Sequence, residues 1–236
     1  MIRTIRWFLG FVIKLIVTLP NLKKVEKLEA SGQKEAMDII VDKQAKDWAR
    51  YLVKLSGTDV TVIGAENVPE GPVLFVSNHQ GNFDIPLIVG FIEKPKGFIA
   101  KVEMKKMYII RKWMQYINCI FIDRNDIRQS VKAISSGVKM LKSGESLVIF
   151  PEGTRSPDGK LLEFKPGSMK LATKSKVPVI PVTINGSKDI MPKGSKIIRP
   201  AKVTITISEP IYYSDLRDTV ELTDMVKTEI EKKLVL

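Results

Sequence analysis

The chain contains one histidine, His79, and Asp84 follows it five residues later. An imidazole accepts a proton near neutral pH, and a neighbouring carboxylate fixes its tautomer and stabilises the imidazolium that then forms. A tight turn at Gly81, with a helix that starts at about Asp84, predicts contact between the carboxylate and one ring nitrogen. Residues 79–84 include no serine or cysteine, so we expect the hydroxyl that this base activates to belong to a substrate. The alternative is a structural histidine beside an aspartate that caps a helix.

Polar clusters stand at the ends of four apolar, β-branched runs that predict buried strands. These clusters are Asn78-His79-Gln80, Lys101-Val102-Glu103, Asp123-Arg124 and Pro151-Glu152-Gly153-Thr154-Arg155. The carboxyl ends of parallel strands share one edge of a sheet, and open α/β sheets bind their ligands at that edge. The sequence therefore predicts one rim that carries a general base beside an anion site.

The elements that must position these residues follow an α/β pattern from residue 58 onward. Runs typical of strands lie at 60–63, 73–77, 98–102, 119–122, 147–150, 179–184 and 203–207. Helical patterns lie at 85–92, 105–116, 127–142 and 167–175, and a last one extends from about 216 to the end. This alternation predicts a largely parallel, mixed central sheet of about seven strands flanked by helices. The run 203–207 alternates polar and apolar residues, which predicts a half-exposed strand at an edge of the sheet.

A helical prefix precedes this pattern. Residues 5–19 extend roughly 22 Å as a helix at ~1.5 Å per residue, which is shorter than the ~30 Å hydrocarbon core of a bilayer. One narrow stripe of this helix is basic, polar or small, and it contains Arg3, Arg6, Gly10, Lys14 and Thr18. The broad apolar remainder predicts a helix that lies in the membrane interface, with its basic residues toward anionic headgroups. A buried helix of a soluble protein and a tilted membrane span stay open as alternatives.

Pro20 predicts the end of this first helix, since proline cannot donate a backbone hydrogen bond. A second helical pattern extends from about 23 to 55, and Gly57 follows it. We therefore divide the chain into an N-terminal two-helix membrane-associating segment, residues 1–57, and one α/β domain, residues 58–236.

The charge and composition of the chain limit the classes of partner and cofactor that it can bind. Lys and Arg total 38 against 26 acidic residues, a net charge of +12, which indicates a nucleic acid, an anionic membrane surface or a phosphorylated substrate as partner. The aromatic residues do not interleave with the basic runs as in a stacking platform, so we expect no nucleic acid. One cysteine and one histidine are too few for a Cys/His zinc site, whereas an all-carboxylate Mg²⁺ site stays open. Phosphate-loop, dinucleotide-binding and nucleophile-elbow motifs do not occur in the sequence.

Four segments in this order resemble the conserved blocks of the glycerolipid acyltransferases. They are NHQGNFD at 78–84, IFIDR at 120–124, FPEGTRS at 150–156 and VPVIPV at 177–182. The resemblance covers roughly residues 58 to 210 and is greatest to the bacterial 1-acyl-sn-glycerol-3-phosphate acyltransferases, the lysophosphatidic acid acyltransferases. In that family the histidine of the His-x₄-Asp motif is the general base and the aspartate orients it, which implies these catalytic roles for His79 and Asp84.

The resemblance also implies a binding site for the phosphate of the acceptor. Six residues stand at positions where the family binds it or where a further cation is expected: Lys101, Arg124, Glu152, Gly153, Thr154 and Arg155. Arginine suits this task because its planar fork makes bidentate contacts with phosphate. Two alternatives stay open. The first is that Arg124 instead forms an ion pair with Asp123 or Asp126. The second is that Glu152 instead accepts backbone N–H groups of its own loop.

The implied reaction moves an acyl chain from acyl-CoA or acyl carrier protein to the 2-hydroxyl of 1-acylglycerol-3-phosphate and makes phosphatidic acid. It implies no acyl-enzyme intermediate, no cofactor and no catalytic metal. The partners are then membrane lipids, lysophosphatidic acid and the acyl donor, at the cytoplasmic face of the inner (cell) membrane. The alternatives are a related acyltransferase with another lysolipid acceptor and a non-catalytic lipid- or phosphate-binding module.

Overall fold

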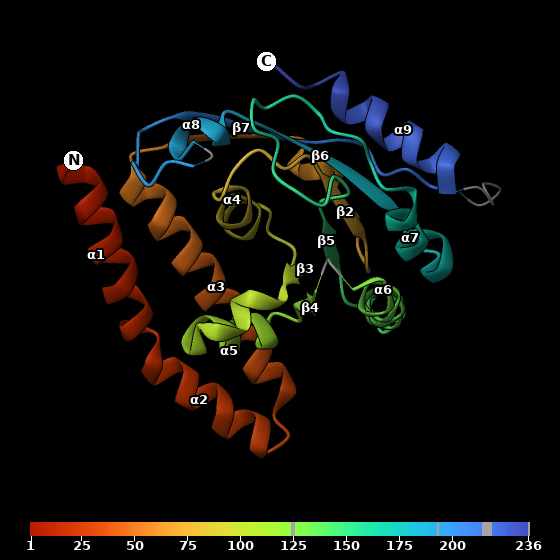
Figure 1. The fold of residues 1–236 in the computed structure, drawn as a ribbon. Helices are drawn as coiled ribbons and strands as arrows, with labels where there is room; N and C mark the ends of the chain where they lie inside the picture. Colours follow the sequence, from red (N-terminus) through yellow and green to blue (C-terminus); the bar gives the residue numbers. More distant parts are fainter. Residues whose placement is uncertain (124–125, 193, 214–218, 236) are drawn as a thin grey trace.

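The computed structural model describes residues 1–123, 126–192, 194–213 and 219–235. Seven strands form one sheet in the order β1-β7-β6-β2-β5-β3-β4 (Figure 1). The strands are β1 (Asp59–Ile63), β2 (Leu74–Ser77), β3 (Gly97–Lys101), β4 (Ile120–Ile122), β5 (Leu147–Ile149), β6 (Val179–Asn185) and β7 (Lys202–Ile207). β6 and β7 pair antiparallel, and the other neighbouring pairs are parallel. The predicted mixed α/β sheet is confirmed.

Helices cover both faces of the sheet. They are α1 (Ile2–Val17), α2 (Leu19–Ala30), α3 (Lys34–Ser56), α4 (Asp84–Phe91), α5 (Tyr108–Tyr116), α6 (Ile127–Lys142), α7 (Lys170–Ser175), α8 (Ser187–Ile190) and α9 (Thr219–Glu231). Three 3₁₀ turns accompany them: η1 (Ala65–Asn67), η2 (Val102–Lys106) and η3 (Pro166–Met169). Successive residues of β2 point to opposite faces, so Phe75 packs in the core beneath α3 and α4, while Leu74 and Val76 pack in the core beneath α6, α7 and α9.

The strand β7 does not lie at an edge of the sheet, contrary to the expectation from its sequence. It pairs with β1 on one side and β6 on the other, and the described edge strands are β1 and β4. Val203, Ile205 and Ile207 are buried, and the residues between them are more exposed. An alternating pattern therefore indicates that one face of a strand is solvent-exposed, and a strand inside a sheet can also have one exposed face.

The helical prefix is confirmed, but its helix boundaries differ from the predicted ones. α1 and α2 follow each other with only Thr18 between them, and Pro20 lies in the first turn of α2, where its missing N–H costs nothing. The predicted helix from about 23 to 55 is divided between α2 and α3. The chain reverses there through Gly32, which has a positive φ of 71°.

α1 packs on α3 through Trp7, Gly10 and Lys14, whereas the sequence predicted that Lys14 faces anionic headgroups. Trp7 is buried and its indole Nε1 donates to the carbonyl of Leu52 at 2.9 Å. Gly10 packs against α3 so closely that an added Cβ would lie 2.4 Å from the Leu55 side chain. The ammonium of Lys14 lies 5.3 Å from the centroid of the Tyr51 ring. The stripe that contains Gly10 and Lys14 thus faces α3.

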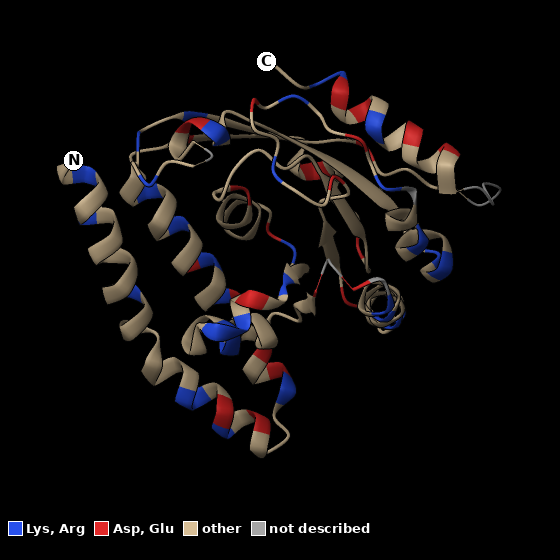
Figure 2. Ribbon diagram, viewed as in Figure 1, with Lys and Arg blue, Asp and Glu red and all other residues tan. Residues whose placement is uncertain are grey.

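The apolar face of α1 is consequently exposed. Its members include Ile2, Ile5, Phe8, Leu9, Val12, Ile13, Ile16 and Val17, each between 42% and 84% exposed. Figure 2 shows few charged positions along α1, whereas charges of both signs occur along α2 and α3. Because the residues of α1 that face α3 are already used in packing, the apolar face has no partner among the described residues of the chain.

Candidate active site

The imidazole of His79 contacts the carboxylate of Asp84, as the spacing predicts. His79 follows β2, and Asp84 is the first residue of α4. The distance between His79 Nδ1 and Asp84 Oδ2 is 2.6 Å. A carboxylate accepts hydrogen bonds, so this contact favours the tautomer with the proton on Nδ1. Nε2 is then the ring nitrogen that can accept a proton.

The Asp84 carboxylate is completely buried and has several donors around it. Besides His79, the backbone N–H groups of Gln80 and Gly81 donate to Oδ2 at 2.7 and 2.8 Å. Ser187 donates its hydroxyl to Oδ1. A buried charge is expensive unless such donors compensate it, and here they do.

The loop that carries His79 is attached to the loop that follows β5. The His79 N–H donates to Glu152 Oε1 at 2.6 Å, and the His79 carbonyl accepts from the N–H of Ser156 at 2.8 Å. The imidazole also stacks on the ring of Phe150, with 4.2 Å between the ring centroids. These contacts fix both the backbone and the ring plane of the histidine.

Glu152 uses its carboxylate within the protein. Oε1 accepts from His79 and Oε2 accepts from the N–H of Leu162 at 3.1 Å, and the residue is 5% exposed. Burial raises the pKa of Glu152 to about 7, because the two backbone donors only partly offset desolvation and the Asp84 charge adds to it. The contact with Leu162 matches the alternative that the sequence left open, a carboxylate that holds its own loop, and the contact with His79 joins a second loop to it.

Four of the residues singled out from the sequence line one cavity: His79, Lys101, Thr154 and Arg155. Lys101 ends β3, whereas Thr154 and Arg155 follow β5. Arg155 Nη1 also donates to the side-chain oxygen of Asn82, which lines the same cavity. Gly153 has a φ of 70°, which turns the chain at this point. Arg124 lies outside the described residues.

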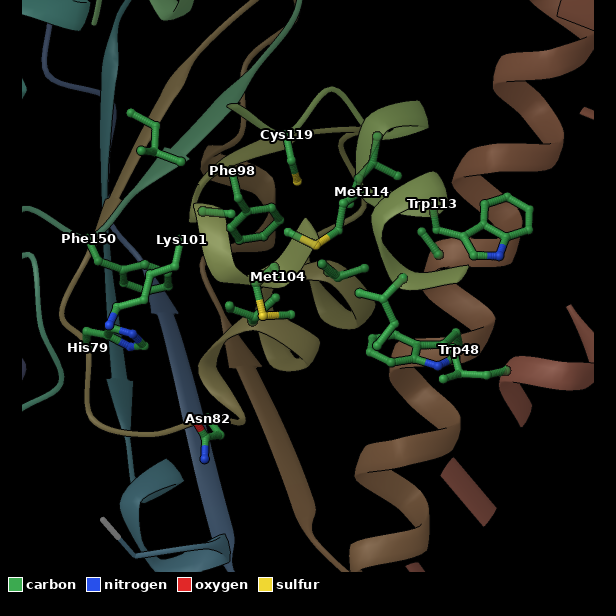
Figure 3. Close-up of a pocket in the computed structure, with 18 of the residues that line it drawn as sticks. Trp48, His79, Asn82, Phe98, Lys101, Met104, Trp113, Met114, Cys119 and Phe150 are labelled. Carbon is green, nitrogen blue, oxygen red and sulfur yellow. The ribbon is translucent and has the colours of Figure 1, made fainter. Parts of the chain in front are cut away.

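The cavity has a volume of about 380 Å³ and is mainly apolar. Figure 3 shows His79, Lys101 and Phe150 together on one side of it and Trp48 and Trp113 on the opposite side. The far wall includes side chains of α3, η2 and α5, and Leu15 and Thr18 at the end of α1 also contribute. The cavity therefore joins the polar rim of the sheet to the helical prefix.

Cys119 also lines the cavity and lies just before β4. Burial raises the pKa of its thiol to about 12. A protonated thiol is a poor nucleophile, so this residue acts as a packing group.

Sequence reasoning missed Ser187 and the short helix α8 that it begins. Ser187 lies 103 residues after Asp84, and a serine after a strand carries no signal of its own. Only the folded chain brings it to the carboxylate. The site as a whole can remove a proton from a hydroxyl held between cations and an apolar cavity.

Comparisons with known proteins agree on one relationship. A family model described as Acyltransferase matches residues 59–185. A probable 1-acyl-sn-glycerol-3-phosphate acyltransferase of Mycoplasma pneumoniae is 33% identical over 82% of this chain and 72% of its own length. A chloroplastic 1-acyl-sn-glycerol-3-phosphate acyltransferase of Brassica napus is 37% identical over 72% of this chain and 50% of its own length. The crystal structure of the 1-acyl-sn-glycerophosphate acyltransferase of Thermotoga maritima superposes with a TM-score of 0.82 at 32% identity, over 98% of this chain and 96% of that one.

Proposed function

Because this chain belongs to the acyltransferase family, we propose that it transfers an acyl chain from an acyl thioester to the 2-hydroxyl of 1-acyl-sn-glycerol-3-phosphate, which makes phosphatidic acid. One observation carries this proposal: the His79–Asp84 pair stands at one end of an apolar cavity with Lys101 and Arg155 beside it. A base, a site for a phosphate and a cavity for a hydrocarbon chain are the features that this reaction needs.

His79 is the general base in this proposal. Asp84 holds the Nδ1 proton, so Nε2 takes the proton of the acceptor hydroxyl while the hydroxyl oxygen attacks the thioester carbonyl. The tetrahedral intermediate then collapses, the C–S bond breaks, and the imidazolium returns the proton to the departing thiolate. The charge on the buried Asp84 stabilises the imidazolium between the two steps.

The cations at the rim bind the phosphate of the acceptor. Arg155 is partly buried beside Asn82, and Lys101 reaches the cavity from the neighbouring part of the rim. Guanidinium and ammonium groups form charge-assisted hydrogen bonds with phosphate oxygens. Glu152 does not need to touch the phosphate in this arrangement, because its carboxylate holds the backbone of His79 and Leu162.

The apolar cavity accommodates a fatty acyl chain. Met104, Met114 and Trp113 are among its lining residues, and methionine side chains adapt well to flexible hydrocarbon. The donor is acyl-CoA or acyl carrier protein, both of which are water-soluble and carry the chain as a thioester. A soluble donor of this kind places the reaction at the cytoplasmic face of the membrane.

The exposed apolar face of α1 supports attachment to that membrane. Sixteen helical residues extend about 24 Å, and a helix with one apolar face sinks ~5–10 Å into the interface. No helix among the described residues is long and apolar enough to cross a membrane. Attachment of this kind brings the cavity, to which Leu15 and Thr18 contribute, near the lipid acceptor.

Product formation by the purified full-length chain tests this function. We expect phosphatidic acid from lysophosphatidic acid with either acyl-CoA or acyl carrier protein, and little product from lysolipids that lack a terminal phosphate. Incubation with His79→Ala is the control for chemistry that is not enzymatic. If another lysolipid gives product faster than lysophosphatidic acid, the acceptor is wrong, and if no lysolipid gives product with either donor, the proposed reaction is wrong.

A further inference from the structure

The two oxygens of the Asp84 carboxylate serve different parts of the chain. The three donors to Oδ2 all belong to the loop of residues 79–81, which carries His79. The donor to Oδ1 is the hydroxyl of Ser187, which comes from the first residue of α8 after β6. Ser187 is therefore the contact that ties Asp84 to an element outside the His79 loop.

Ser187 is held in place by the backbone around it. It is completely buried. Gly186 before it has a φ of 85°, and an added Cβ there would lie 2.3 Å from the carbonyl oxygen of Lys202 in β7. On the other side, the carbonyl oxygen of Ser187 lies 3.1 Å from the position that a Cβ on Gly81 would occupy. The serine is thus fixed between β7 and the turn beside the catalytic histidine.

A carboxylate on its own does not have a fixed orientation. The terminal torsion of aspartate is broad and roughly two-fold, so rotation by half a turn exchanges the two oxygens. Rotation by less than that lengthens the hydrogen bond to His79 Nδ1 and removes the preference for one tautomer. A donor on Oδ1 opposes this rotation because it fixes the second oxygen.

We propose that Ser187 is a positioning residue of the active site, whose hydroxyl fixes the rotation of the Asp84 carboxylate so that Oδ2 stays on His79 Nδ1. The role in catalysis rests on the proposed function, whereas the effect on the histidine tautomer does not. Ser187 is not among the residues that line the cavity. Its loss should therefore change the chemical step and leave the binding of both substrates unchanged.

The first measurement needs no substrate. His79 is the chain's one histidine, so nitrogen NMR of histidine-labelled full-length protein reports a single imidazole. We expect the native protein to hold one tautomer with the proton on Nδ1, and Ser187→Ala to populate both tautomers. An unchanged tautomer population in Ser187→Ala overturns the proposal, whatever reaction the protein catalyses.

Kinetics supply the second measurement. A hydrogen bond to a charged group corresponds to a factor of roughly ten to a hundred, so Ser187→Ala should lower kcat at least tenfold and change neither KM by more than about twofold. Ser56→Ala is the matched control. Ser56 is also completely buried, and its hydroxyl donates to the Val53 carbonyl at 2.6 Å near the end of α3. This control should leave kcat unchanged.

A double-mutant cycle separates positioning from a general loss of stability. If Ser187 acts through Asp84, adding Ser187→Ala to Asp84→Asn should lower kcat by less than about threefold. If the two losses multiply in full, Ser187 acts on the fold and not on the carboxylate, and the proposal is wrong. If the native protein shows no transfer activity, the proposed function is wrong. The NMR result would still decide whether Ser187 positions the Asp84 carboxylate.

Discussion

The rim of the sheet and helix α1 both depart from the usual distribution of polar and apolar residues, in opposite directions. At the rim, the acidic residues Asp84 and Glu152 are buried. On α1, a row of large apolar side chains is exposed, while Lys14 lies against Tyr51. The buried carboxylates have hydrogen-bond donors inside the protein. The apolar face of α1 has no partner among the described residues, and a lipid surface is the partner that we propose for it.

Burial alone therefore does not identify a functional region of this molecule. A functional region is indicated by a side chain in an unfavourable environment, such as a buried carboxylate or an exposed apolar group, together with the partner that compensates for it. At the rim, the partners are the hydrogen-bond donors within the protein. Substitutions there should therefore impair catalysis even when no membrane is present. For α1, the proposed partner is the membrane, so substitutions on its apolar face should have an effect only when a bilayer is present.

The largest loss of turnover is expected when the proposed general base, His79, is replaced. His79→Ala should lower turnover by about 10²–10⁴-fold or more, the usual contribution of a general base, and the midpoint of thermal unfolding should change little. Steady-state transfer assays measure this with both donors. Turnover close to that of the native protein would remove His79 from the mechanism. The defect should be the same in vesicles and in solution, since the base acts in both.

The next effect concerns the phosphate site. Arg155→Ala should raise KM for lysophosphatidic acid at least tenfold, because one charge-assisted hydrogen bond contributes about 1.5–3 kcal/mol. KM for the acyl donor should change much less. Initial-rate kinetics with each substrate varied in turn distinguish the two constants. Equal increases in both would indicate that Arg155 stabilises the loop through Asn82 and does not bind the acceptor.

Substitutions on α1 test whether its exposed apolar face binds lipid. Leu9 and Ile13 are 59% and 49% exposed, and they lie one helical turn apart on the apolar face. The variant Leu9→Ser/Ile13→Ser should weaken binding to vesicles at least tenfold, because each side chain loses about 1 kcal/mol of burial in lipid. Vesicle co-sedimentation measures this, and activity on a short-chain, water-soluble acceptor should not change.

Ile39→Ser is the matched control for α1. Ile39 is 64% exposed on α3, so the substitution removes a similar apolar group from a different surface. Vesicle binding should stay close to that of the native protein. Equal losses in both variants would show that general surface hydrophobicity, and not the orientation of α1, attaches the protein to lipid.

The last prediction concerns the dependence of the free energy of unfolding on pH at Glu152. Its pKa rises from 4.5 to about 7 on folding, so the folded protein binds this proton more tightly than the unfolded chain. The contribution of Glu152 to the free energy of unfolding should therefore fall as the pH rises from about 4.5 to 7, and should stay constant outside this range. Denaturant unfolding at several pH values should show this slope in the native protein, and Glu152→Gln should lack it. Identical slopes would contradict the shift.

Much of the architecture could be predicted because each part depends on local information. Strands are short apolar runs, and each of the seven predicted runs overlaps one of β1 to β7. Their order in the sheet was not local information: β7, predicted at an edge, lies inside the sheet, and β4, predicted as a buried strand, is a half-buried edge strand. The start of α6 depends on equally local contacts, since the Asp126 side chain accepts from the N–H groups of Arg128 and Gln129. The rim followed from one further rule, that parallel strands end on the same side. The roles of its residues in binding and catalysis stay predictions.

The candidates for catalysis and binding came from the sequence alone: one histidine, an aspartate five residues after it, and cations after predicted strands. These depend on residue type and short spacing, which folding does not change. The fold was needed to bring Ser187 to Asp84, to place β7 inside the sheet, and to bring Trp7, Gly10 and Lys14 of α1 against α3. Each of these is a contact between segments far apart in the chain. Periodicity gives a helix two distinct faces but does not say which of them meets the protein, because that depends on the surface it packs against, here the Tyr51 and Leu55 side chains beside Gly10.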